Sequence, residues 1–134
     1  MAFHCFCRAI IARQPIRIYG DGEQTRDFTY VADVVEANIL AASREQAIGK
    51  VLNVAGGTRI SIYQAVQLLQ DISGLSASII AGDKQYGDVR HTSAATARAE
   101  QILGYHPVVS LREGLTRQFQ YMLSLYGCGR IASA

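Results

Sequence analysis

Proline, tryptophan and cysteine are scarce or absent in this sequence, and the few cysteines do not form a recognisable metal or disulfide pattern. Its 134 residues include two prolines, no tryptophan and three cysteines. Cys5 and Cys7 lie close together whereas Cys128 is distant, a spacing typical of neither a zinc site nor a disulfide framework. A metal site that adds His4 to the first two thiols is the alternative to reduced, structural cysteines. We favour the structural cysteines and expect no metal.

Charge of one sign and long apolar runs are also lacking. Thirteen basic and eleven acidic side chains leave a net charge of +2, spread along the chain, so we expect neither a nucleic acid nor an anionic membrane surface as partner. The apolar stretch from Val31 to Ser43 is interrupted by polar residues and is shorter than the roughly 20 apolar residues of a membrane span. The first 14 residues do not form a secretory signal. The sequence therefore predicts a cytoplasmic protein that does not cross a membrane.

The motifs of a complete nucleotide-dependent enzyme are missing as well. A dinucleotide-binding strand runs into a glycine-rich turn and a helix, but Gly20-Asp-Gly22 and Gly56-Gly57 are too short and wrongly spaced for such a turn. The chain has no nucleophile elbow, and Tyr30 has no lysine four residues later. We therefore predict no catalytic residue and no cofactor-binding residue.

The hydrophobic fraction of 49% is enough for one domain, residues 1–134, with a core from about 2 to 126. Periodicity predicts helices and strands in mixed order, which is a small mixed α/β fold. The expected helices are 2–13, from Asp33 to about Ser43, from Ser61 to Gly74, 97–103, and a last one from Ser110 to about Tyr126. The expected strands are 16–19, 50–54 and 76–81, and the segment 28–31 is rich in residues that favour strands.

Short-range signals mark the helix ends. Ser61 with Gln64 and Ser110 with Glu113 have the spacing of a capping box, in which the two side chains satisfy amides of the first turn. Asp33 is expected to accept the free amides at the start of its own helix. A long polar loop over residues 82–92 is of the kind that often binds ligands.

Candidate binding residues lie in loops and at a strand entrance. Arg26 offers a planar guanidinium for bidentate contact with phosphate, and its alternative role is a surface ion pair with Asp27. Asp88 and Arg90 offer an acceptor for sugar hydroxyls and a donor for phosphate, although on these residues alone a turn-forming aspartate beside an exposed arginine is the better explanation. His91 could act as acid or base, but the sequence indicates no partner for it.

At these residues the chain closely resembles the NAD-dependent epimerase/dehydratase family, which are extended short-chain dehydrogenases acting on sugar nucleotides. The resemblance runs over about residues 2–126 in the order and spacing of the family's carboxy-terminal part. It is carried by Pro15-Ile-Arg-Ile-Tyr-Gly-Asp-Gly-Glu-Gln-Thr-Arg-Asp-Phe-Thr-Tyr-Val-Ala-Asp-Val-Val-Glu-Ala-Asn38, Asn53-Val-Ala-Gly-Gly-Thr-Arg-Ile-Ser-Ile62, Gly87-Asp-Val-Arg-His-Thr-Ser93 and Ala99-Glu-Gln-Ile-Leu-Gly-Tyr-His-Pro107.

The resemblance implies a role for individual residues of this chain. It makes Arg26 the arginine that grips the nucleotide diphosphate and Phe28 the aromatic residue beside the nucleoside. Ile62 falls where an apolar residue packs on the base, and Asp88 where a carboxylate accepts a ribose hydroxyl. The implied ligand is a nucleoside diphosphate sugar, with a UDP-sugar favoured.

The chain departs from the family pattern at three positions. Gln85 stands where many galactose-epimerase-like members have a second phosphate-binding arginine, and Arg90 lies close enough in the loop to substitute for it. Ala95 stands where the family commonly has an aspartate that caps the next helix, and Arg98 replaces a frequent lysine. These changes fit either a divergent subfamily or a sequence that drifts without selection.

The family's Rossmann domain, with its Gly-x-x-Gly-x-x-Gly turn and its Tyr-x-x-x-Lys pair, has no counterpart in the sequence. We therefore expect the substrate-binding domain of a truncated or split member, without catalysis of its own and without bound cofactor, NAD belonging to the complete family enzyme. The alternative is a non-catalytic protein-interaction module. The implied partners are a separate Rossmann-domain chain or a second copy of this chain.

Overall fold

The computed structural model describes residues 2–127, so Cys128 lies outside the described part. Within this part the chain forms two compact units. Of the described residues, unit 1 comprises 2–24, 61–90 and 112–127, and unit 2 comprises 25–60 and 91–111. Both units contain helices and strands, which confirms the predicted mixed α/β class. The expectation of a single domain stays a prediction.

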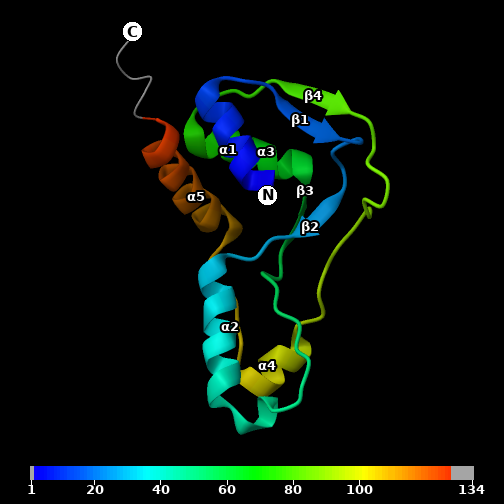
Figure 1. Ribbon diagram of the computed structural model, residues 1–134, viewed down its shortest axis with the longest axis vertical. Helices are drawn as coiled ribbons and strands as arrows, with labels where there is room; N and C mark the ends of the chain where they lie inside the picture. The colour runs from blue at the N-terminus through cyan, green and yellow to red at the C-terminus, as the bar shows by residue number, and fades with distance from the viewer. Residues whose placement is uncertain (1, 128–134) are drawn as a thin grey trace. The chain divides into compact units, whose positions relative to one another are not determined.

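Unit 1 is built on a two-stranded parallel sheet, visible in Figure 1 as the neighbouring arrows β1 and β4. In this sheet Ile16 is opposite Ile79 and Tyr19 is opposite Gly82. Helices α1 and α3 pack together, and α1 also packs on β1. The elements are α1 (Ala2–Ala12), β1 (Ile16–Tyr19), α3 (Ile62–Ser73), β4 (Ile79–Gly82) and α5 (Leu111–Tyr126), the last from Arg112 onward.

Unit 2 has a smaller core. Helix α4 packs against α2 and against the short 3-10 helix η1. The buried residues of its hydrophobic cluster are Ala37, Ala99, Leu103 and Tyr105. Strands β2 and β3 pair into a second sheet. The elements are β2 (Thr25–Asp27), α2 (Val31–Ser43), η1 (Glu45–Ala47), the first residues of β3 (Arg59–Ser61) and α4 (Ala97–Leu103).

The signals that act over one helical turn predict the structure well. Around α3 the Ser61 hydroxyl accepts from the Gln64 amide at 3.1 Å, and the Gln64 side chain accepts from the Ser61 amide at 2.8 Å. This confirms the first capping box. Gly74 and Gly104 end α3 and α4 with φ of +67° and +69°, values that favour glycine. The second capping box, at Ser110, stays a prediction.

Two strand predictions need correction. Residues 50–54 form no strand, although Leu52 and Val54 pack on the core of unit 2 while Val51 is exposed. The alternation correctly indicates which side chains face the core and are partly buried, but a strand also needs a neighbouring strand to which its backbone can hydrogen-bond. The strand-favouring segment 28–31 is likewise not a strand, because β2 ends at Asp27 and α2 begins at Val31. The strand expected at 76–81 is β4, Ile79–Gly82.

The predicted role of Asp33 is wrong. The residue before α2 is Tyr30, and its side chain makes no capping hydrogen bond. Asp33 is in the first turn, exposes 3% of its surface, and its two carboxylate oxygens accept from the amides of Val108 and Val109 at 3.1 and 3.3 Å. The carboxylate therefore joins α2 to a distant loop of unit 2 instead of closing its own helix.

Within residues 2–127 no helix is long and apolar enough to cross a membrane. The same residues contain no group of three or more histidine, cysteine, aspartate and glutamate side chains arranged to hold a metal ion.

Candidate functional site

Arg26 is the central residue of β2 in unit 2. Its side chain is half-buried, and its Nη1 donates to the carbonyl oxygen of Thr25 at 2.8 Å. Asp27, the alternative partner expected from the sequence, accepts from the amide of Gly56 at 3.1 Å through Oδ1. The strand thus holds a partly sheltered guanidinium whose position is tied to the backbone.

Phe28 follows directly after β2 and is also half-buried. Its carbonyl oxygen lies so close to Gly56 that a Cβ built at that glycine would be 2.2 Å from it. Any larger residue at position 56 would therefore displace the backbone of Phe28. The sequence indicated a turn at Gly56-Gly57, but not that this glycine permits the close approach.

The 83–90 loop of unit 1 carries Asp88 and Arg90. The amide of Asp88 donates to the Gln85 carbonyl at 3.2 Å, and Asp88 is half-buried. Arg90 is exposed, and its Nη1 donates to Oδ2 of Asp21 at 2.5 Å. Gln85 is exposed and donates to the carbonyl of Asp83 at 3.4 Å.

Asp21 is a residue that sequence reasoning missed. The guanidinium of Arg90 holds the pKa of the Asp21 carboxyl below its usual value, with a smaller contribution from the Glu23 amide, which donates to Oδ1 at 3.0 Å. The pKa of Arg90 is raised in turn by this hydrogen bond. The only local signal was the turn Gly20-Asp21-Gly22, which does not reveal that a residue 69 positions away is its partner. Arg90 is thus already paired with an anion of unit 1.

Ile62 is the first residue of α3 and exposes 9% of its surface, so in unit 1 it belongs to the apolar core. Of the five residues predicted to bind substrate, the structure places Arg26 and Phe28 in unit 2 and the other three, Ile62, Asp88 and Arg90, in unit 1.

His91 has the partner that the sequence did not indicate. Its Nδ1 and the hydroxyl of Thr25 are hydrogen-bonded at 2.8 Å, and the two residues form an isolated parallel β-bridge within unit 2. The imidazole is therefore attached to the strand that carries Arg26.

The helix that follows Gly56-Gly57 does not fit the pyrophosphate of NAD. A dinucleotide site needs free amides at a helix start. At the start of α3 the amides of Ile62 and Tyr63 donate to the carbonyls of Gln24 and Gly22 at 3.2 and 3.1 Å, and the next amide donates to Ser61. The amides that would hold a phosphate there are already used by the chain itself.

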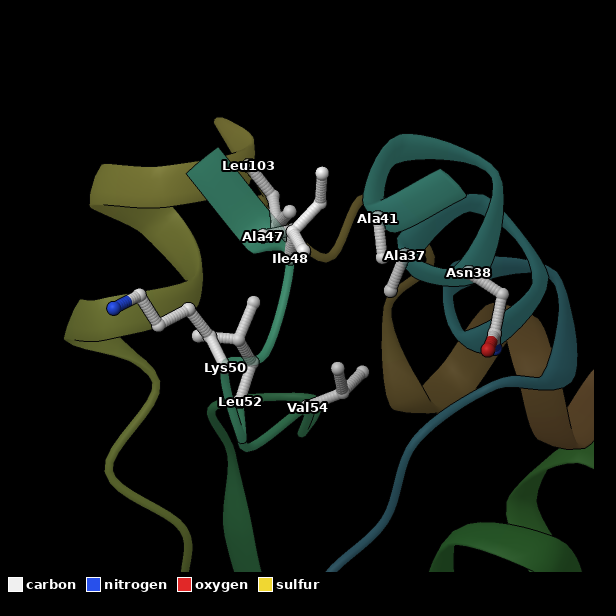
Figure 2. Close-up of a pocket in the computed structure, with 9 residues that line it drawn as sticks. All are labelled: Ala37, Asn38, Ala41, Ala47, Ile48, Lys50, Leu52, Val54 and Leu103. Atoms are coloured by element: carbon white, nitrogen blue, oxygen red, sulfur yellow. The ribbon is translucent and has the colours of Figure 1, made fainter. Parts of the chain in front are cut away.

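A pocket of about 270 Å³ lies within unit 2, apart from the predicted site residues. Figure 2 shows Ala37 and Ala41 of α2 on one side and Ile48 and Leu103 on the other. In the same view the ammonium group of Lys50 extends away from these apolar side chains. The pocket is therefore mainly aliphatic, and the polar residues in its lining are Asn38 and Lys50.

Comparison with known proteins places these features in a family. The family model "NAD dependent epimerase/dehydratase family" matches residues 2–55. The chain is 39% identical over 126 residues to an uncharacterized UDP-glucose epimerase, YtcB, of Bacillus subtilis, covering 94% of this chain and 40% of that protein. It is 35% identical over 118 residues to the UDP-glucuronate 4-epimerase of Thermodesulfobacterium geofontis, covering 87% of this chain and 36% of the relative.

Solved structures give the same result. The UDP-glucuronic acid 4-epimerase of Bacillus cereus, in complex with UDP-glucuronic acid and NAD, matches with a TM-score of 0.91 and 36% identity, over 94% of this chain and 40% of that one. The UDP-glucose 4-epimerase of Thermotoga maritima with UDP-glucose matches with a TM-score of 0.84 and 33% identity. That match covers 90% of this chain and 38% of the epimerase chain. The chain spans about two fifths of the length of these relatives. It belongs to the NAD-dependent epimerase/dehydratase family, and its fold corresponds to the carboxy-terminal part of the epimerase structures.

Proposed function

We propose that this chain binds the nucleoside diphosphate of a UDP-sugar and is the substrate-binding part of an NAD-dependent sugar-nucleotide epimerase or dehydratase. The observation that carries the proposal is the half-buried guanidinium of Arg26, held on a short anchored strand with Phe28 two residues further on. Relatives that match over nearly the whole chain include an epimerase in complex with UDP-glucuronic acid, and another with UDP-glucose.

The chemistry of Arg26 suits this role. A guanidinium always carries its charge and presents its N–H groups in a plane, so it can donate two parallel hydrogen bonds to phosphate oxygens. Hydrogen bonds to charged groups contribute about 1.5 to 3 kcal/mol each. An aromatic side chain beside it offers a surface on which the nucleoside can stack.

For the three residues in unit 1 the proposed roles are those that the resemblance implies. Asp88 accepts a ribose hydroxyl and Ile62 contacts the base, which requires its buried side chain to become more exposed. Arg90 contacts phosphate only in competition with the carboxylate of Asp21, to which it is already bound. The phosphate binding proposed for this chain therefore depends mainly on Arg26.

The contribution proposed for this chain is binding and not bond-breaking chemistry. Hydride transfer is the chemistry that a nicotinamide cofactor supplies when bound, and the start of α3 does not fit the pyrophosphate of NAD. No step of the proposed function passes through NAD. The residues of this chain bind and orient the nucleotide part of the substrate.

Calorimetric titration with UDP-glucuronic acid and UDP-glucose tests the proposal. Arg26→Ala should weaken binding at least about tenfold, because a charge-assisted contact is lost. Arg98→Ala is the matched control, since Arg98 is an exposed arginine on α4 of the same unit, and its affinity should be unchanged. Equal affinity of Arg26→Ala and the unmodified chain would show that the diphosphate does not contact Arg26. An unmodified chain that binds neither UDP-sugar would contradict the proposed function itself.

A second candidate function is that of a protein-interaction module, and the outer face of α2 favours it. Val31, Val35 and Ile39 are 66%, 52% and 58% exposed on one helix, an unusual concentration of aliphatic surface. The partner would be a second copy of this chain or a chain that carries a Rossmann domain. Light scattering after size-exclusion chromatography distinguishes the cases: a monomer at high concentration contradicts self-association, and Val35→Lys should dissociate an oligomer that uses this face.

A further inference from the structure

The two residues on either side of Arg26 are both anchored to loops of unit 2. On one side, the hydroxyl of Thr25 is hydrogen-bonded to Nδ1 of His91 at 2.8 Å. The carbonyl of the same residue accepts from the amide of Thr92 at 3.1 Å. Side chain and backbone of Thr25 are thus attached to the same short segment, residues 91–92.

On the other side, Asp27 is anchored to a different loop. Its Oδ1 accepts from the Gly56 amide at 3.1 Å, and the missing side chain of Gly56 lets the backbone of Phe28 approach. Because a Cβ at position 56 would be 2.2 Å from the Phe28 carbonyl oxygen, the two segments are in tight contact there.

The geometry of a strand converts these two anchors into an orientation for the residue between them. Successive side chains of a strand point to opposite faces, so Thr25 and Asp27 share one face and Arg26 projects from the other. The Thr25 carbonyl, held in place by Thr92, also accepts from Nη1 of Arg26 at 2.8 Å. The anchored strand therefore fixes both the direction in which Arg26 leaves the backbone and one end of its guanidinium.

We propose that Thr25 and Asp27 are positioning residues for Arg26, with His91 and the Gly56 amide as their supports, so that the guanidinium is oriented before a diphosphate arrives. The inference rests on the proposed function of Arg26. Bidentate recognition depends on the plane of the guanidinium, and a flexible arginine must lose rotamer freedom to provide it. Holding Arg26 in advance reduces this cost of binding.

Substitutions at Thr25 test the first anchor. Thr25→Val keeps the shape of the side chain but removes the hydroxyl, and should weaken UDP binding about three- to tenfold, as expected for one hydrogen bond. Thr25→Ser keeps the hydroxyl and should restore affinity to within about twofold. His91→Phe removes the same hydrogen bond from the other side and should reproduce the effect of Thr25→Val, which also covers the case in which one variant does not fold.

Coupling with Arg26 separates positioning from a general structural role. In an Arg26→Ala background, Thr25→Val should weaken UDP binding no further, because its effect acts through the missing guanidinium. If the two losses add in full, Thr25 does not act through Arg26 and the inference is wrong.

At Asp27 the informative pair is Asp27→Ala and Asp27→Asn. The asparagine oxygen can still accept from the Gly56 amide, so Asp27→Asn should bind UDP nearly as the unmodified chain does, while Asp27→Ala should lose about three- to tenfold. Equal losses in both variants would show that Asp27 acts through its charge, which contradicts the anchor.

A measurement without ligand keeps the inference independent of the proposed function. In NMR spectra of the ¹⁵N-arginine-labelled chain, the Arg26 side-chain signal should shift and gain mobility in Thr25→Val and Asp27→Ala, and remain unchanged in Thr25→Ser and Asp27→Asn. If the unmodified chain binds no UDP, the proposed function fails while this result still decides whether Arg26 is positioned. An Arg26 signal that is identical in all four variants overturns the inference.

Discussion

In unit 1 the buried side chains are mostly large and apolar, contributed by the inner faces of α1, α3 and α5 and by β1. In unit 2 the buried cluster contains two alanines, one leucine and one tyrosine. Unit 2 adds directional polar contacts instead: Asp33 accepts two distant amides, and the hydroxyl of Tyr105 donates to the Ala55 carbonyl at 3.0 Å. Unit 1 therefore depends mainly on packed volume, and unit 2 on hydrogen bonds that hold its loops.

This difference is consistent with the position of the proposed phosphate-binding residue, Arg26, in unit 2. A loop-rich unit held by individual hydrogen bonds can fix one side chain in a defined direction, as β2 does for Arg26. The following predictions would break or sharpen the comparison, from the largest expected effect to the smallest.

Removing volume from the core of unit 1 should have the largest effect. Leu69 on α3 is fully buried, so Leu69→Ala should lower the free energy of unfolding by about 2 to 5 kcal/mol, through lost transfer energy and the cavity that remains. Urea denaturation measures this. Leu123→Ala, at a 40% exposed position on α5, is the control and should cost much less. A loss below about 1 kcal/mol for Leu69→Ala would contradict a core that depends on packing.

Removing the buried carboxylate of unit 2 should come next. Asp33→Ala leaves the amides of Val108 and Val109 without their acceptor, and should cost about 2 to 3 kcal/mol. Hydrogen exchange of these two amides should accelerate in the variant. Asp33→Asn retains one acceptor oxygen, so its free energy of unfolding should lie between those of the unmodified chain and Asp33→Ala. Unchanged protection of both amides would show that Asp33 does not hold this loop.

Alkaline pH should weaken unit 1 through Cys7. Burial raises the pKa of this thiol from 9.0 to about 11. Because the folded chain keeps the proton that the unfolded chain releases, this contribution to stability is complete below about pH 9 and is lost as pH rises to about 11. The loss is at most about 3 kcal/mol, because one pKa unit corresponds to about 1.4 kcal/mol. Other groups also titrate in this range, so the free energy of unfolding is measured against pH for both the unmodified chain and Cys7→Ala. Between about pH 9 and pH 11 it should fall less steeply in Cys7→Ala.

The smallest expected effect is the loss of one hydroxyl in unit 2. Tyr105→Phe removes the donor to the Ala55 carbonyl and should lower the free energy of unfolding by about 1 kcal/mol. Desolvation, together with the charges of Asp33 and Asp27, raises the pKa of the Tyr105 hydroxyl. In an ultraviolet titration the signal missing from Tyr105→Phe should therefore be one that ionises above the usual tyrosine pKa. If the tyrosine signal lost in Tyr105→Phe instead ionises at the usual tyrosine pKa, the hydroxyl of Tyr105 is exposed to water and the prediction is wrong.

The same contrast separates what could be predicted from what could not. The helices of unit 1 follow from apolar periodicity, and the start of α3 follows from a serine and a glutamine three residues apart. In unit 2 the segment 50–54 has the alternation of a strand without a strand beside it. Periodicity reports which side chains face a core, while a sheet also depends on what the rest of the chain places alongside.

The candidate site shows this limit most clearly. Residue chemistry and family resemblance both drew attention to Arg26 and Arg90, but neither indicated that Thr25, with its own anchors, contacts Arg26 or that Asp21 pairs with Arg90. These contacts join positions that are far apart in the chain, such as Thr25 and His91, which are separated by 66 residues. Nothing local to either residue indicates the other.

By itself, therefore, the sequence determined the family, the mixed α/β class, most helices and the turns at their ends, because these depend on residues within one or two helical turns or on a long ordered pattern. Only the tertiary structure decided which donors the carboxylates bind. Asp21, Asp27 and Asp33 all stand at turns or element ends. Asp21 binds a guanidinium and a nearby amide, Asp27 binds one amide, and Asp33 binds two. A carboxylate accepts hydrogen bonds from any donor, so its partner is set by which donor the folded backbone brings within reach.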